Sequence, residues 1–185
     1  MPSYTTENIR NIAIVGHALS GKTTLTEALL HKAGVIGSPG TVEKGDTVAD
    51  FEPEEKEYQH SLVAAVVSLD HDGTHINLID TPGYPDFIGH TLTTLPAVET
   101  AAVVVSASAG IEMITQRLME RAAERKLCRL IVINKIDAPD IDLPALLGRI
   151  QETFGRECLP INLPSGGGKT VVDCFFNPSG EADFS

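Results

Sequence analysis

The residues with the clearest capacity for chemistry lie in a glycine-bounded loop near the start of the chain. Residues 16–23 read Gly-His-Ala-Leu-Ser-Gly-Lys-Thr, which matches the phosphate-loop pattern at every fixed position. In such a loop, backbone N–H groups and the start of the following helix surround phosphate oxygens. Lys22 is expected to reach the β- and γ-phosphates, and the Thr23 hydroxyl to ligate Mg²⁺. The predicted nucleotide contacts are His17, Ala18, Leu19, Ser20, Gly21, Lys22, Thr23 and Thr24.

A second motif, Asp-Thr-Pro-Gly at 80–83, follows an apolar segment. A carboxylate at the end of a strand beside a phosphate loop can hold Mg²⁺, so Asp80 is a predicted metal ligand. The Gly83 N–H can donate to a γ-phosphate. An isolated tetrapeptide of this kind is often only a turn, but its position downstream of a phosphate loop favours the metal-binding interpretation.

A third motif, Asn-Lys-Ile-Asp at 134–137, closes another apolar run. The Asp137 carboxylate can accept hydrogen bonds from guanine N1–H and the exocyclic amine, a donor pair that adenine lacks. Asn134 is expected to tie this loop to the phosphate loop, and the Lys135 stem to cover the base. Asp137 alone could be a helix-capping residue. Three motifs in this order indicate a site for GTP or GDP.

A glycine-rich segment at 166–170, Gly-Gly-Gly-Lys-Thr, also approaches the phosphate-loop pattern. Its first fixed glycine is missing, because Leu163 occupies that position, and no helical periodicity follows. We interpret this segment as a flexible linker.

The elements that must position these motifs alternate between apolar strands and helices. Strands are expected at 12–15, 62–69, 74–79, 101–106, 130–134 and 159–163, and helices at 24–33, 112–126 and 143–154. The turn at 70–73 makes the second and third strands antiparallel. The alternation predicts an α/β fold with a mostly parallel sheet and helices on both faces. Residues 36–60 are polar and suggest a mobile connection, and the pattern dissolves from Ser165 onward.

Together with the segment 50–55, Asp-Phe-Glu-Pro-Glu-Glu, and the run 80–87, these motifs resemble translational GTPases of the elongation factor G type and related elongation-factor-G-like proteins. The resemblance covers about residues 8–165. It implies a P-loop NTPase G domain, GTP/GDP and Mg²⁺ as ligands, and the ribosome as a partner of the full-length protein. It places the first switch at residues 40–61 and Ser61 in the Mg²⁺ shell; an ordinary strand-start serine is the alternative.

Three features of the sequence depart from that family. Tyr84 stands where the family usually has a His that positions the attacking water, and Leu19 where its phosphate loop usually has Asp. Tyr-Gln-His at 58–60 replaces the family's Arg-Gly-Ile. We therefore expect nucleotide binding with slow or absent hydrolysis. Replacement of part of the lost function by His60 is the less favoured alternative. The candidate catalytic residues are Lys22, Gly83 and Tyr84.

The resemblance also implies a domain organisation. Residues 1–164 correspond to a G domain without its last strand and helix, and residues 165–185 to the start of an inserted subdomain or a tail. The family backs the guanine with a Ser-Ala loop that lies beyond that subdomain. Ser165, with Gly166, is the candidate substitute.

Charge and composition restrict the partners. A net charge of −11, from 14 basic and 25 acidic residues, disfavours a broad nucleic-acid surface. The closely spaced basic residues are expected on a solvated helix face: Arg117, Arg121, Arg125, Lys126 and Arg129. No apolar run is long enough to span a bilayer, so a cytoplasmic location is expected. The chain is also expected to be a monomer. Two alternatives to a GTPase are a non-hydrolysing guanine-nucleotide sensor and a P-loop ATPase or kinase, which Asp137 disfavours.

Overall fold

The computed structural model describes residues 4–176, 178 and 180–184. The chain divides into two compact units, which are described separately. The first runs to Val105 and includes Glu112–Val132, and the second comprises Ser106–Ile111 and the described residues from Ile133 onward. No helix among the described residues is long and apolar enough to cross a membrane.

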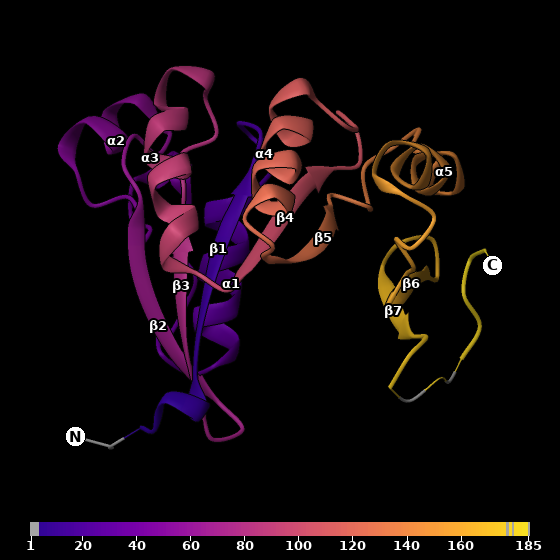
Figure 1. Ribbon diagram of the computed structural model, residues 1–185, viewed down its shortest axis with the longest axis horizontal. Helices are drawn as coiled ribbons and strands as arrows, with labels where there is room; N and C mark the ends of the chain where they lie inside the picture. The colour runs from indigo at the N-terminus through magenta and orange to yellow at the C-terminus, as the bar shows by residue number, and fades with distance from the viewer. Residues whose placement is uncertain (1–3, 177, 179, 185) are drawn as a thin grey trace. The chain divides into compact units, whose positions relative to one another are not determined.

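A five-stranded sheet with the order β2-β3-β1-β4-β5 organises the fold (Figure 1). Its strands are β1 (Ile9–Gly16), β2 (Ala65–His71), β3 (Thr74–Asp80), β4 (Thr100–Ser106) and β5 (Cys128–Asn134). β1 pairs in parallel with both β3 and β4, whereas β2 is antiparallel to β3. The predicted mostly parallel sheet and its antiparallel pair are therefore confirmed.

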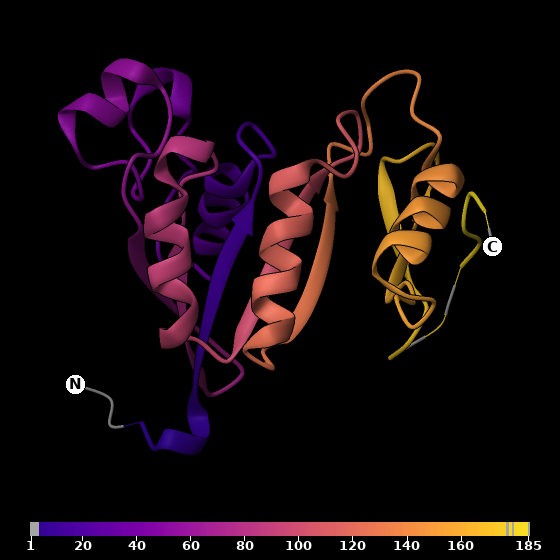
Figure 2. The same ribbon diagram turned by 45° about the horizontal axis from the view of Figure 1, so that its top comes forward.

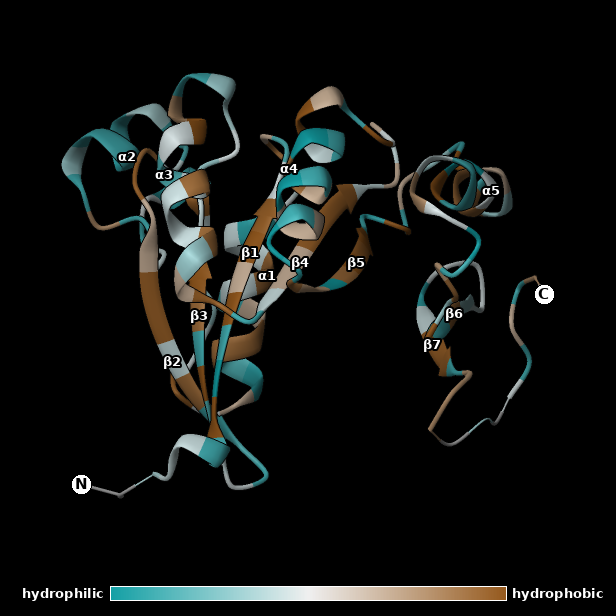
Figure 3. Cartoon of the chain, viewed as in Figure 1, coloured by the Kyte–Doolittle hydropathy of each residue, from teal (hydrophilic) through white to brown (hydrophobic). Residues whose placement is uncertain are grey.

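Helices lie on both faces of the sheet. α1 (Lys22–Lys32) covers one face, and α3 (Ile88–Thr94) and α4 (Met113–Glu124) cover the other (Figures 1 and 2). β4 is apolar from Ala101 to Val105 and buried throughout that stretch, as a central parallel strand covered on both sides should be (Figure 3). The core under α1 consists of Ile14, Leu30, Leu69, Leu78 and Val104. α3 was not predicted, because its short, threonine-rich sequence shows little helical periodicity.

The segment 36–60 is more structured than the expected mobile connection. It contains a 3₁₀ turn (Val42–Lys44) and the helix α2 (Pro53–Tyr58). Glu27 on α1, which is 1% exposed, accepts hydrogen bonds from the N–H groups of Gly40 (2.8 Å) and Val48 (2.6 Å). A contact from a distant helix leaves no trace in the local pattern, which explains why the polar composition alone was misleading.

The second unit contains α5 (Leu143–Phe154), at the predicted bounds, and a small hairpin. The strand expected at 159–163 is instead β6 (Asn162–Ser165), and it pairs antiparallel with β7 (Thr170–Asp173), which was not predicted. The glycine segment between them is an ordered turn and not a flexible linker. Its three glycines have φ values of 63°, 70° and 79°, a left-handed conformation that glycine adopts without steric cost. A strand follows this turn, so its rejection as a second phosphate loop holds.

Candidate nucleotide-binding site

The phosphate loop connects β1 to α1, and its lysine lies inside it. Lys22 is buried and donates from Nζ to the carbonyl oxygen of His17 at 2.9 Å. Burial lowers the pKa of Lys22 to about 8, although the nearby carboxylates of Asp80 and Asp50 oppose the shift. The ammonium group thus stays predominantly charged at neutral pH and points into the loop where phosphate oxygens would be received.

The Asp-Thr-Pro-Gly motif packs directly against this loop. A Cβ atom on Gly83 would lie 2.7 Å from the Ala18 nitrogen and would collide with Lys22 Nζ. Only glycine therefore lets the two backbones approach so closely. The Thr81 hydroxyl donates to the carbonyl oxygen of Ile14 on β1 at 2.8 Å, which fixes the motif to the strand that leads into the phosphate loop.

The three predicted metal ligands also converge near the start of α1. The Thr23 and Ser61 hydroxyl oxygens are 3.2 Å apart. Ser61 in turn donates to Asp50 Oδ1 at 2.7 Å, and Asp50 is held by the Thr47 hydroxyl at 3.0 Å. Asp80 is 1% exposed and lies close to the Thr23 hydroxyl and the Lys22 ammonium, which favour its charged form. Neither of its oxygens has a partner in good hydrogen-bonding geometry among the described residues. Asp50 is a member of this cluster that the sequence reasoning did not single out.

These groups fit a magnesium ion. Mg²⁺ prefers oxygen ligands and usually takes only one or two carboxylates, with waters and substrate phosphates completing the shell. The hydroxyls of Thr23 and Ser61 and the buried Asp80 carboxylate supply that kind of donor set. No group of three or more His, Cys, Asp or Glu side chains in the described part of the chain is arranged to hold a metal ion.

Asp80 should make the stability of the metal-free chain depend on pH. Burial raises its pKa from 3.8 to about 7, because the Thr23 hydroxyl and the Lys22 ammonium offset only part of the desolvation. Because the folded state holds this proton more tightly, its stabilising effect is complete below about pH 4 and is lost as the pH rises through 7. We expect Asp80→Asn to gain stability relative to wild type between pH 5 and pH 8, by on the order of a few kcal/mol.

Urea unfolding with EDTA at the two pH values measures this difference. Asp86→Asn is the matched control, since Asp86 is an exposed carboxylate in the same region of the chain. Parallel pH dependence of the unfolding free energy in Asp80→Asn and wild type would contradict the expectation.

The remaining phosphate-loop residues differ in their surroundings. Ser20 is buried, Ala18 is half-buried and Thr24 is exposed. Leu19 is 71% exposed with a φ of 61°, a left-handed conformation that costs energy for a branched residue. Its side chain brings no ligand atom to the loop.

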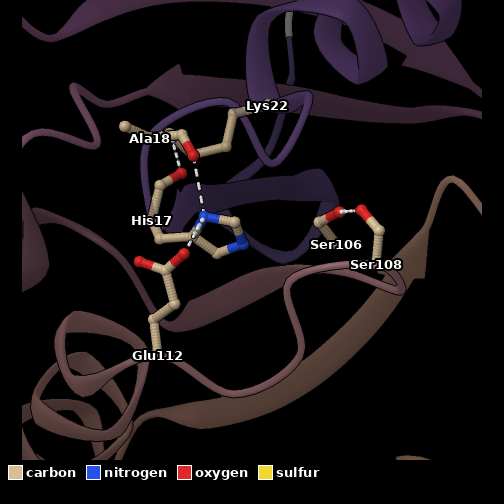
Figure 4. A network of polar contacts seen from close by, with 6 residues as sticks. All are labelled: His17, Ala18, Lys22, Ser106, Ser108 and Glu112. Carbon is tan, nitrogen blue, oxygen red and sulfur yellow. Dashed lines mark hydrogen bonds and ion pairs between the residues drawn. The ribbon is translucent and has the colours of Figure 1, made fainter.

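His17 forms a contact that the sequence analysis did not anticipate. Its Nδ1 lies 2.7 Å from the Ala18 carbonyl oxygen and 3.3 Å from Glu112 Oε1 (Figure 4). Both oxygens are acceptors, so Nδ1 carries a proton and donates. This contact links the phosphate loop to the residue that precedes α4, and spacing in the sequence offers no signal for it.

The base-reading candidates lie in the second unit. The Asn134 carbonyl oxygen accepts from the Ala107 N–H at 2.8 Å, and the nearby Ser106 and Ser108 hydroxyls, also drawn in Figure 4, are 2.9 Å apart. Lys135 has a φ of 60°, and Asp137 is exposed.

The glycine turn of the β6–β7 hairpin lies beside this loop. A Cβ atom on Gly168 would lie 2.8 Å from the Ile136 carbonyl oxygen and 3.7 Å from the Asp137 Cα. Ser165 is at the end of β6, where its hydroxyl donates to the Glu181 carbonyl oxygen at 2.8 Å. Thus Asn134, Lys135, Asp137 and Ser165 share one unit, whereas the phosphate-loop and metal candidates share the other.

Comparison with known proteins agrees with these motifs. Residues 7–176 match the elongation factor Tu GTP binding domain family. The elongation factor G-like protein of Mycobacterium tuberculosis (strain H37Rv) is 41% identical over 160 residues, which cover 86% of this chain and 22% of that protein. The mitochondrial ribosome-releasing factor 2 of Bos taurus is 39% identical over 168 residues, or 89% of this chain and 22% of that protein.

Solved structures agree as well. A crystal structure of a Thermus thermophilus protein superposes with a TM-score of 0.84 and 43% identity, covering 89% of this chain and 25% of that one. This chain spans about a fifth of the length of the curated relatives it matches. It therefore belongs to the elongation factor Tu GTP binding domain family, as a P-loop G domain similar to those of elongation-factor-G-like translational GTPases.

Proposed function

We propose that this chain binds GTP and GDP with Mg²⁺ and hydrolyses GTP slowly. The observation that supports the proposal most directly is the convergence on one loop of Lys22, Gly83, the Thr23–Ser61 hydroxyl pair and the buried Asp80. Phosphoryl transfer needs little covalent chemistry from a protein, and it depends on positioning and on charge stabilisation. This cluster offers both.

In the proposed reaction, water attacks the γ-phosphate in line with the leaving oxygen. Lys22 and the N–H groups of the loop stabilise the negative charge that develops on the phosphate oxygens, and the Gly83 N–H donates to the γ-phosphate. A bound Mg²⁺, held by Thr23, Ser61 and Asp80, would neutralise further phosphate charge. Tyr84 follows Gly83 and takes the place of the family's His. A phenol reproduces neither the shape nor the charge of an imidazole, so hydrolysis is slow.

Selection of guanine is assigned to Asp137, with Asn134 and Lys135 supporting the loop. Ser165 backs the base in this proposal, because the hairpin turn that follows it lies against the Ile136–Asp137 backbone. The ribosome is the proposed partner of the full-length protein. The chain itself is proposed to act as a cytoplasmic monomer without a broad nucleic-acid surface. The basic residues on and after α4 are all exposed, as a solvated face would be: Arg117, Arg121, Arg125, Lys126 and Arg129.

Calorimetric titration of the chain with GDP and with ADP, both with Mg²⁺, tests the proposal. We expect GDP to bind at least about 100-fold more tightly than ADP, because only guanine matches the acceptor pair of Asp137. Equal affinity for the two nucleotides, or a preference for ADP, would contradict guanine selection and favour a P-loop ATPase or kinase.

A second candidate function is a non-hydrolysing guanine-nucleotide sensor. The observation that favours it is the exposed, apolar Leu19 in the phosphate loop, together with the tyrosine at position 84. Turnover of GTP with and without ribosomes separates the two functions. Appreciable stimulated hydrolysis would exclude the sensor.

A further inference from the structure

The backbone at His60 and just after it is hydrogen-bonded to one buried residue, Glu55. Its N–H donates to the Glu55 carbonyl oxygen at 3.2 Å. The Glu55 side chain, 1% exposed, accepts from the N–H groups of Leu62 (2.9 Å) and Val63 (3.2 Å). Gln59 turns the chain with a φ of 57°. The backbone around His60 is thus anchored, although the residue itself follows the last turn of α2.

The imidazole ring belongs to an aromatic cluster that includes the tyrosine at the position of the family's His. Its centroid is 4.7 Å from that of Tyr84 and 6.2 Å from that of Phe87. The centroid of the Tyr58 ring is 6.1 Å from that of His60. Rings at such separations pack favourably, so the cluster holds the imidazole against Tyr84.

The hydrogen bond at Nδ1 defines the tautomer of the neutral ring. Nδ1 is 2.9 Å from the Tyr58 carbonyl oxygen, which can only accept, so Nδ1 carries the proton. Nε2 then bears a lone pair, and no hydrogen bond or ion pair to this atom occurs among the described residues. The half-buried imidazole therefore offers an acceptor nitrogen that the fold does not use.

Both neighbours of this ring pair touch the phosphate loop. Ser61, next to His60, lies 3.2 Å from the Thr23 hydroxyl. Gly83, next to Tyr84, packs against Ala18 and the Lys22 ammonium. His60 therefore adjoins Ser61, and Tyr84 adjoins Gly83, in the sequence. Ser61 and Gly83 make the two contacts that line the γ-phosphate side of the proposed site.

We infer that His60 positions the water that attacks the γ-phosphate, as an imidazole supplied from the switch segment instead of from position 84. Nε2 accepts a hydrogen bond from the water, and the Tyr84 ring holds the imidazole in place. A pure packing role is the competing explanation, since the ring also packs near Tyr58 and Phe87. This inference rests on the proposed GTP hydrolysis and adds to it the residue that orients the nucleophile.

Two substitutions at position 60 separate the chemistry from the packing. His60→Phe keeps an aromatic ring but has no nitrogen, whereas His60→Gln keeps a hydrogen-bonding group but has no ring. We expect single-turnover GTP cleavage to fall at least about 10-fold in His60→Phe, which is below the factor of about 10²–10⁴ that a well-positioned group contributes. His60→Gln should retain more activity than His60→Phe. A packing role predicts the opposite order.

GTP and GDP affinities are measured in parallel and should change less than about twofold, because His60 is not among the proposed nucleotide contacts. His90→Phe and His90→Gln on the exposed surface of α3 are the matched controls and should cleave GTP as wild type does. Wild-type cleavage in His60→Phe, or greater loss in His60→Gln, overturns the inference. Wild type that binds GTP without cleaving it also overturns the inference but leaves nucleotide binding intact. No GTP binding by wild type contradicts the proposed function itself.

Discussion

Replacement of Asp137 by Asn should weaken GDP binding by about 100-fold or more and move the preference of the chain to xanthosine diphosphate. The carboxylate accepts hydrogen bonds from two guanine donors. In the Asn side chain one of the two acceptor oxygens is replaced by an NH₂ group, so a donor faces one of the guanine donors. An unmatched polar pair enclosed on base binding costs about 2–3 kcal/mol or more, which corresponds to that factor. Xanthine carries a carbonyl where guanine has its amine, so it accepts from the Asn amide and recovers the lost contact.

Calorimetric titration of wild type and Asp137→Asn with both diphosphates in Mg²⁺ measures the exchange. Asp140→Asn is the matched control: it removes an exposed carboxylate three residues away, at a φ of 59° that asparagine tolerates. The control should keep the wild-type preference for GDP. A variant at position 137 that still prefers GDP would mean that another residue reads the base.

The parts of the fold that were predictable are those determined by local pattern. α5 was predicted at its observed bounds. In the structure, Leu146 and Ile150 form a buried stripe at helical spacing, and the Asp142 side chain caps the first turn by accepting from the Ala145 N–H. The antiparallel β2–β3 pair follows from a turn that leaves only four residues between the two expected strands. The order of the motifs also predicted that Asp80, at the end of its strand, lies beside the phosphate loop.

The segment 36–60 was not predictable in the same way. Its structure depends on carboxylates that act over long distances in the chain, such as Glu27, which reaches backbone N–H groups 13 and 21 residues away. A buried Glu in a helix looks like any polar residue until its partners are known. Asp50 was missed for the same reason, since its role appears only when Ser61 is folded back onto it.

The β6–β7 hairpin shows that glycine content alone does not distinguish a flexible linker from a defined turn. Three glycines followed by Lys169 and Thr170 were recognised as an unusual group, but composition alone suggested flexibility. The left-handed φ angles are those of a tight turn, and the N–H groups of Gly167 and Gly168 donate to Asp183 Oδ2 at 3.0 and 3.1 Å. A glycine run thus forms either a linker or a defined turn, and the partner that decides between them lies outside the run.

Replacement of Tyr84 by His should accelerate single-turnover GTP cleavage by about 10- to 100-fold without a comparable change in nucleotide affinity. An imidazole at this position would present a ring nitrogen to the attacking water, one residue from the Gly83 backbone that lines the phosphate loop. A positioned group of this kind contributes in the range of about 10²–10⁴ to a rate, and an imidazole introduced without its supporting shell recovers only part of that. Tyr4→His is the control and should leave the rate unchanged, because the Tyr4 hydroxyl donates to Asp70 and its ring stacks on His75.

The double variant His60→Phe/Tyr84→His extends this measurement. If His60 orients water in the wild type, the new imidazole takes over that task, so the loss caused by His60→Phe should be smaller in the Tyr84→His background than in wild type. Equal losses in the two backgrounds would mean that the two positions act independently. A Tyr84→His variant no faster than wild type would show that the rate is limited elsewhere in the site, with Leu19 the foremost remaining departure from the family pattern.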